Sequence, residues 1–292
     1  MSPPPAIDRP ADQPVERYAV IGNPVAHSQS PFIHGAFARQ TGEAMVYERM
    51  LAPIQGFEAA VRAFAAAGGR GCNVTLPFKF EAPALAARCS ERARLATAAN
   101  LLRFDTGGWF ADNTDGIGLV RDIELGAGVA LAGRRVLLIG AGGAGAGVLG
   151  PLLQAQPAGL CLANRSAARA QQLAERHRAL AAALGVPLVA GGLEAPAGVF
   201  DIVINASASS LSSAPVPVDP ARLAPGTLAV DLMYGAAAQP FLAWARAHGA
   251  RPRDGLGMLV EQAAEAYLIW RGRRPQTAPV LAALRQRLEA AA

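Results

Sequence analysis

The stretch GCNVTLPFKF at residues 71–80 contains Lys79, the only lysine of the chain, whereas the other 26 of the 27 basic side chains are arginine. Arginine keeps its proton at any working pH, but lysine can release and recover one. Pro77 suits the first position of a helix. We therefore expect Lys79 in the first turn of that helix, where the positive end of the helix dipole repels a cation and eases proton release. A proton donor that must recycle explains Lys79 better than a stray lysine in an arginine-rich chain.

Asp115 lies in ADNTDGIG at residues 111–118, directly after the strand-like segment GGWFAD. An enzyme that reduces a carbonyl with hydride needs a proton for the forming alkoxide, and an ammonium held by a carboxylate can donate it. Asp115 is the best candidate for that carboxylate. Taken alone, however, the stretch favours a plainer interpretation, in which Asp115 caps a helix that starts near Ile117.

Two serines, Ser28 and Ser30, alternate in HSQS, a loop that follows the first expected strand. A turn with a helix cap before Pro31 is the structural interpretation. The functional one is that the two hydroxyls hold a substrate carboxylate. The four histidines show no metal-ligand spacing, so we expect no metal site; they are His27, His34, His177 and His248.

A glycine-rich loop follows the apolar strand-like segment in RRVLLIGAGGAGAG (134–147). Gly140, Gly142 and Gly145 give the pattern G-x-G-x-x-G between a strand and a helix. Glycine permits a tight turn and close approach of a pyrophosphate, and the helix N-terminus offers free N–H groups. In this context the pattern predicts a dinucleotide site, although alanine- and glycine-rich sequence can produce it by chance.

The end of the next strand discriminates between NAD and NADP. An NAD site needs Asp or Glu there to bind the ribose hydroxyls. Here, 24 positions after Gly140, the chain has Asn164, Arg165 and Ser166, followed by Arg169. Two guanidinium groups one helical turn apart suit a 2′-phosphate, so we predict NADP. The alternative is a pair of ordinary surface arginines.

The elements that position these residues alternate between strand-like and helical segments almost throughout. This order predicts an α/β fold with mostly parallel sheets and helices over their faces. The expected strands are 17–22, 45–51, 71–76, 134–140, 159–165, 199–207 and 226–234, and the expected helices are 31–42, 57–69, 167–185, 257–271 and 279–291.

Composition narrows the class of protein further. The three cysteines, Cys72, Cys89 and Cys161, form no CxxC pair, which argues against a disulfide scaffold and suits a reducing cytoplasm. The net charge is +5, but the arginines are scattered and form no basic stripe for nucleic acid. Residues 1–16 are polar and proline-rich and are expected to be a disordered tail. We expect no membrane span.

Seven motifs occur here in the order seen in the shikimate dehydrogenase family, and the chain resembles that family over nearly all of its length after the tail. They are IGNPVAHSQSPFIH (21–34), NVTLPFK (73–79), DNTDG (112–116), GAGGAG (140–145), NRS (164–166), INAS (204–207) and DGLGMLVEQAA (254–264). The resemblance implies an oxidoreductase that reduces 3-dehydroshikimate to shikimate with NADPH, in chorismate and aromatic amino acid biosynthesis.

The resemblance also implies roles for particular residues. Lys79 and Asp115 correspond to the catalytic pair. The substrate-binding positions of the family correspond to Ser28, Ser30, Thr75, Asn100, Tyr234 and Gln262, with Asp115 also on a substrate hydroxyl. The NADP-binding positions correspond to Gly140, Ala141, Gly142, Gly143, Ala144, Asn164, Arg165, Ser166, Arg169, Leu232 and Gly255.

By the same resemblance, residues 17–115 and 255–292 form a substrate-binding and catalytic domain, and residues 116–254 form a Rossmann-like NADP-binding domain. The expected partners are a small-molecule substrate and no nucleic acid or membrane, with the chain a monomer or homodimer. Two alternatives stay open: a paralogue that accepts quinate, and a nucleotide-binding regulator without turnover.

Overall fold

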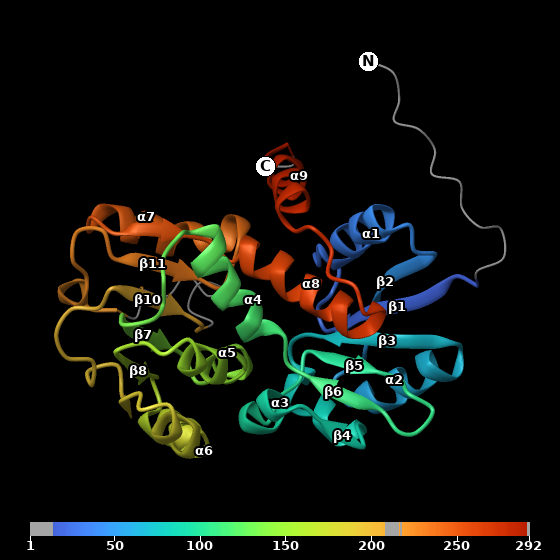
Figure 1. The fold of residues 1–292 in the computed structure, drawn as a ribbon, viewed down its shortest axis with the longest axis horizontal. Coiled ribbons are helices and arrows are strands. Elements are labelled where there is room, and N and C mark those ends of the chain that lie inside the picture. Colours follow the sequence, from blue (N-terminus) through green and yellow to red (C-terminus); the bar gives the residue numbers. More distant parts are fainter. Residues whose placement is uncertain (1–13, 208–215, 217, 291–292) are drawn as a thin grey trace.

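The computed structural model describes residues 14–207, 216 and 218–290. Within these residues the strands form two six-stranded sheets, one in each half of the molecule (Figure 1). Most of the expected tail, residues 1–13, lies outside the described part of the chain. The first strand already begins at Glu16, the last residue assigned to that tail.

The first sheet has the order β2-β1-β3-β5-β6-β4. Its strands are β1 (Glu16–Gly22), β2 (Met45–Leu51), β3 (Gly69–Val74), β4 (Arg88–Cys89), β5 (Leu101–Arg103) and β6 (Phe110–Asp112). Strands β2, β1 and β3 are parallel, as the alternation predicts, whereas β5 is antiparallel to both β3 and β6. The associated helices are α1 (Ser30–Thr41), α2 (Phe57–Ala66) and α3 (Glu91–Ala96).

The second sheet is parallel in every ladder, with the order β9-β8-β7-β10-β11-β12. Its strands are β7 (Arg135–Ile139), β8 (Gly159–Ala163), β9 (Leu188–Gly191), β10 (Ile202–Asn205), β11 (Leu228–Asp231) and β12 (Arg251–Arg253), with helices α5 (Gly143–Gln154), α6 (Ala167–Ala183) and α7 (Gln239–Ala247). If β7 is counted as the first strand and β12 as the sixth, this is the 3-2-1-4-5-6 order of a Rossmann fold. The strand order reverses direction between β7 and β10, and this position is the switch point of the sheet.

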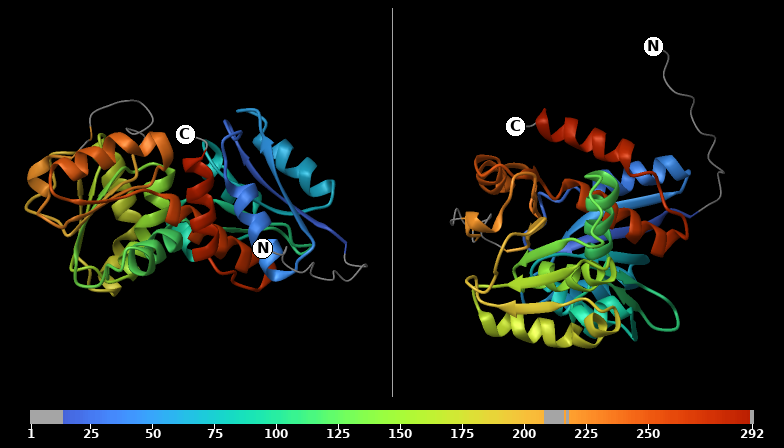
Figure 2. Two further views of the ribbon diagram at one scale, coloured as in Figure 1. Left: turned by 90° about the horizontal axis from the view of Figure 1, so that it is seen from above. Right: turned by 60° about the vertical axis from the view of Figure 1, so that its left-hand side comes forward.

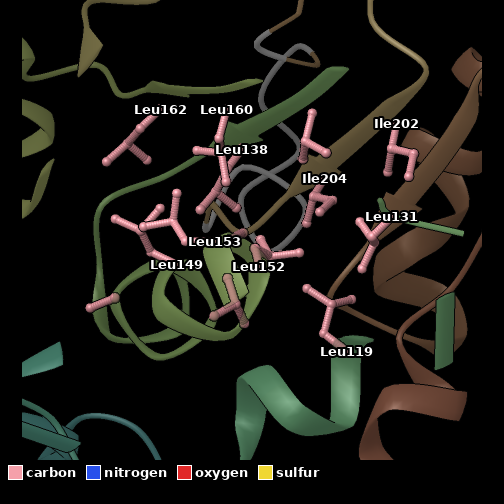
Figure 3. Packing of buried hydrophobic residues seen from close by; sticks show 14 of the residues in the cluster. Leu119, Leu131, Leu138, Leu149, Leu152, Leu153, Leu160, Leu162, Ile202 and Ile204 are labelled. Atoms are coloured by element: carbon pink, nitrogen blue, oxygen red, sulfur yellow. The ribbon is translucent and has the colours of Figure 1, made fainter. Parts of the chain in front are cut away.

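The core of the second sheet explains why its strands read as continuous apolar runs. Helices cover both faces of a parallel sheet, so side chains on both faces are buried. Figure 3 shows Leu149 and Leu152 of α5 packed beneath Leu138 of β7 and Ile204 of β10. Leu119 joins the same cluster from outside this sheet and ties the connecting helix to it.

Two helices link the halves. The chain leaves the first sheet through the first of them, α4 (Asp115–Arg121), and continues in a π-helical turn (Asp122–Gly126). After β12 it returns through the second, α8 (Leu256–Arg271), which is followed by α9 (Ala278–Glu289). Helix α8 packs against α4, α1 and α9 (Figures 1 and 2). None of the helices in the described ranges is long and apolar enough to cross a membrane.

The structure corrects the expected environment of Lys79. Instead of an α-helix from Pro77, the chain forms two short 3₁₀ turns, Phe78–Phe80, which contains Lys79, and Ala82–Leu85. An α-helix there would need an N–H at position 83 to bond the carbonyl of Lys79, and Pro83 has none. That carbonyl accepts a hydrogen bond from Ala99 N at 2.8 Å instead. The prediction that a helix dipole acts on Lys79 was therefore wrong, because a single short turn carries little macrodipole.

Candidate active site

A cleft of about 360 Å³ lies between the two halves and is lined from both. Lys79 and Asp115 meet in its wall, where Lys79 Nζ donates to Asp115 Oδ2 at 2.5 Å. The two side chains are only 14% and 7% exposed. Asp115 does not cap α4 but is its first residue, preceded by Thr114 in the cap position. The local interpretation of Asp115 as a helix cap was therefore wrong.

Asn100 fixes the second oxygen of Asp115. Its Nδ2 donates to Asp115 Oδ1 at 2.8 Å and lies 3.2 Å from Gln262 Oε1. Gln262 in turn donates from Nε2 to Leu259 O at 2.9 Å, within its own helix. One buried amide, that of Asn100, thus orients both Asp115 and Gln262, the residue from the returning helix.

The DNTDG turn is held from its other end by Arg92, which sequence reasoning missed. Arg92 donates from Nε and Nη2 to the two oxygens of Asp112, both at 2.7 Å, and Ser90 also donates to Asp112. The same Nη2 lies 3.3 Å from Glu265 on α8. Burial lowers the pKa of the guanidinium and the pairing with Asp112 raises it, with a net rise. One side chain thus joins the turn to the helix that carries Gln262.

The expected substrate-binding residues line the same cleft. Ser28, Ser30, Thr75 and Tyr234 belong to its lining together with Asn100 and Gln262. Ser28 Oγ lies 3.2 Å from Ser30 Oγ, so the two hydroxyls form one polar patch. Burial raises the pKa of the Tyr234 phenol, which stays neutral and able to donate a hydrogen bond.

The glycine loop follows β7 at the switch point of the second sheet. Gly140 has φ +110° and its Cα faces the backbone of Ala206, where a Cβ would lie 2.8 Å from the carbonyl carbon. A Cβ on Gly145 would lie 1.9 Å from Gly140 O. Both positions therefore require glycine. Gly142, before the first turn of α5, faces open space, which leaves room for a ligand at the helix N-terminus.

The predicted cofactor-discriminating residues lie beside this loop. Asn164 Oδ1 accepts from Ala141 N at 3.1 Å, and its Nδ2 donates to Ser166 O at 2.9 Å. Arg165 and Arg169 are exposed, and neither has a carboxylate within 4.0 Å among the described residues. Two uncompensated guanidinium groups next to the loop suit a phosphate.

The glycine loop also lies next to Lys79, which is paired with Asp115. A Cβ placed on Gly143 would lie 3.6 Å from Lys79 Cβ, and Ala144 lines the cleft. Leu232 and Gly255 line the same cleft from the second sheet and approach closely, since a Cβ on Gly255 would lie 2.2 Å from Leu232 O. All the expected substrate-binding residues therefore line this cleft, as do Ala144, Leu232 and Gly255 of the expected cofactor set. Four others of that set, Asn164, Arg165, Ser166 and Arg169, follow β8 and lie outside the cleft.

The comparisons with known proteins point to one family. The shikimate dehydrogenase substrate binding domain matches residues 20–102, the shikimate / quinate 5-dehydrogenase family matches residues 124–213, and the shikimate 5'-dehydrogenase C-terminal domain matches residues 255–285. A relative from Acidovorax sp. (strain JS42), named shikimate dehydrogenase (NADP(+)), is 60% identical over 94% of this chain and 98% of its own.

Solved structures agree with these matches. An Ael1 enzyme from Pseudomonas putida superposes with a TM-score of 0.83 at 47% identity, covering 92% of this chain and 98% of that one. Shikimate 5-dehydrogenase from Thermus thermophilus, in complex with NADP(H) and shikimate, gives 0.77 at 30% identity, covering 93% and 99%. With the relative of 60% identity, they establish that the chain belongs to the shikimate dehydrogenase family.

Proposed function

We propose that this protein catalyses the reversible NADP-dependent reduction of 3-dehydroshikimate to shikimate, in the cytoplasm, as a step of aromatic amino acid biosynthesis. The observation that carries the proposal is the Lys79–Asp115 pair, with Nζ and Oδ2 2.5 Å apart in a cleft shared with the glycine loop. The family to which the chain belongs supports the same reaction.

Proton transfer is the task of Lys79. The ammonium has three N–H donors, of which one is engaged by Asp115, so others remain for a substrate oxygen. When bound, NADPH supplies the hydride for the carbonyl carbon. Lys79 donates a proton to the carbonyl oxygen in reduction and takes it back in oxidation, while Asp115 holds the nitrogen in place.

The other cleft residues bind and orient the substrate. Ser28 and Ser30 bind the ring carboxylate through their hydroxyls. Thr75, Asn100, Asp115 and Gln262 bind ring hydroxyls, and Tyr234 donates its phenol hydrogen near the ring. The burial of Asn100, at 3% exposed, excludes water from competition for these bonds.

The glycine loop and its neighbours fit NADP. The free space at Gly142 and the N-terminus of α5 suit the pyrophosphate. Asn164, Arg165, Ser166 and Arg169 would hold the adenosine 2′-phosphate. Leu232 and Gly255 would hold the nicotinamide end, and the remaining loop positions that would bind NADP are Gly140, Ala141, Gly143 and Ala144.

The domain division follows from these assignments. Residues 17–115 and 255–292 form the substrate-binding and catalytic domain, and residues 116–254 form the NADP-binding domain. The two sheets and the return of α8 to α1 support this division. The chain functions with a small-molecule substrate, without nucleic acid or membrane, as a monomer or homodimer.

The test is NADP reduction with shikimate, run beside quinate and beside Lys79→Ala. We expect turnover with shikimate in preference to quinate. Lys79→Ala should lower kcat by about 10²–10⁴-fold, the contribution of a general acid, while shikimate affinity changes little. Near-normal turnover of the variant would refute the role of Lys79. NADPH binding without shikimate oxidation by the unmodified protein would instead indicate a regulator.

A further inference from the structure

Arg49 lies on β2, an edge strand of the first sheet, and contacts the loop that carries the two serines. Its Nε and Nη2 both donate to the backbone oxygen of Ser28, at 2.9 and 2.6 Å. Arg49 is two residues from Tyr47, so both side chains leave β2 on the same face. Tyr47 stacks on His34 of α1, which identifies this as the face that α1 covers.

The bond from Arg49 restrains the backbone of the turn that carries both serine hydroxyls. Ser28 N donates to Val25 O at 3.1 Å, and Ser30 N lies 3.3 Å from Ser28 Oγ. The segment is thus a tight turn, and the carbonyl oxygen of Ser28 within it accepts both hydrogen bonds from the Arg49 guanidinium. A fork with two donors holds one carbonyl more firmly than a single donor does, so Arg49 restrains the turn from outside the cleft.

The charge of Arg49 also matters, because the cleft itself is nearly neutral. Lys79 and Asp115 line it as an ion pair and largely cancel each other at a distance. Arg49 has no carboxylate within 4.0 Å in the part of the chain that the structure describes, since its neighbour Glu48 pairs with Arg17 at 2.7 Å. Its field reaches the Tyr234 hydroxyl, where it opposes the rise in pKa caused by burial.

We propose that Arg49 is a specificity-determining residue for the carboxylate of the substrate. It acts from behind the serine turn, by restraining the backbone that carries the hydroxyls of Ser28 and Ser30 and by supplying the positive charge that the cleft wall lacks. The inference rests on the proposed function, since it takes the substrate to be a ring acid held at these serines.

Calorimetric titration of shikimate and of its methyl ester tests this inference without turnover. Arg49→Gln should weaken shikimate binding about tenfold, as loss of a charge-assisted interaction does, while ester binding changes less than about twofold. Arg49→Lys keeps the charge but loses the two-donor guanidinium, so its shikimate affinity should lie between that of the unmodified protein and that of Arg49→Gln. Arg17→Gln is the matched control, because it removes a half-exposed guanidinium from the adjacent β1 without touching Ser28. In steady-state kinetics, Arg49→Gln should raise the KM for shikimate, with kcat within about threefold of the unmodified protein.

Three results would overturn the inference. These are unchanged shikimate affinity in Arg49→Gln, an equal loss for acid and ester, or Arg49→Lys no better than Arg49→Gln. If the unmodified protein binds shikimate but reduces no NADP, the proposed function fails, and the calorimetric comparison still decides the role of Arg49.

Discussion

The substitution Gly118→Ala probes the crossing of α4 and α8, which sets the active-site geometry. A Cβ at position 118 would lie 2.6 Å from Gln262 Cβ, 2.7 Å from Gln262 N and 2.8 Å from Met258 O. Two of these atoms are backbone, so no change of rotamer relieves the clash. Ordinary contact begins near 3.4 Å, and α4 must therefore move away from α8 by up to about 0.8 Å.

This movement acts directly on Asp115, the carboxylate of the proposed catalytic pair. Asp115 begins α4 and Gln262 belongs to α8, and Asn100 bridges them at 2.8 and 3.2 Å. Separation of the helices lengthens one of these bonds. A misplacement of this size is expected to lower kcat with shikimate by about 10- to 100-fold. Overpacking should lower the free energy of unfolding by about 1–3 kcal/mol.

Steady-state kinetics and urea unfolding measure the two effects, with Gly35→Ala as the control. Gly35 lies in α1, and a Cβ there would meet only Arg39 Nη1, at 3.6 Å. The control should keep its kcat and gain up to about 1 kcal/mol of stability, since alanine favours a helix over glycine. Wild-type kcat and stability in Gly118→Ala would refute the argument that this close approach positions Asp115.

Two further predictions concern pH and the cofactor. Burial lowers the pKa of His34 from 6.5 to about 3. Between these two pH values the unfolded state takes up a proton that the folded state does not. The free energy of unfolding therefore falls as pH drops from about 6.5 toward 3, by about 1.4 kcal/mol per pH unit. His34→Phe should flatten this loss in urea unfolding at pH 7 and 4.5, and identical acid sensitivity would contradict it. Arg165→Gln and Arg169→Gln should each raise the KM for NADP about tenfold and leave that for NAD unchanged. Equal rates with NAD and NADP in the unmodified protein would show that these arginines do not discriminate.

Local patterns predicted the longer elements well because their periodicity is a local property. The expected strand 45–51 coincides with β2 (Met45–Leu51), and the helix 257–271 differs from α8 by one residue. The short strands β4, β5, β9 and β12, each of two to four residues, were not predicted. The turn at Lys79 was mispredicted because Pro83, which leaves the Lys79 carbonyl without a helical partner, was overlooked. The N–H that bonds this carbonyl instead, that of Ala99, is not local and could not be predicted.

The proposed catalytic pair, Lys79 and Asp115, shows that local sequence is also a limited guide to the site. Lys79 stands out by composition, but its partner is 36 positions away, and the local sequence favoured a capping role for Asp115. Arg49 and Arg92 were missed altogether. Nothing in the sequence separates them from the other arginines; only their acceptors, Ser28 O and Asp112, reveal what they hold.

The contrast between these arginines and Lys79 gives the count of one lysine a physical meaning. Arg49 and Arg92 are used where a charge must stay fixed and several donors must converge on one acceptor, which a guanidinium does well. In the proposed mechanism Lys79 gives up a proton and takes it back, which a guanidinium cannot do at working pH. On that proposal the two arginines hold segments next to the cleft, and the single lysine marks the position where the charge changes during turnover.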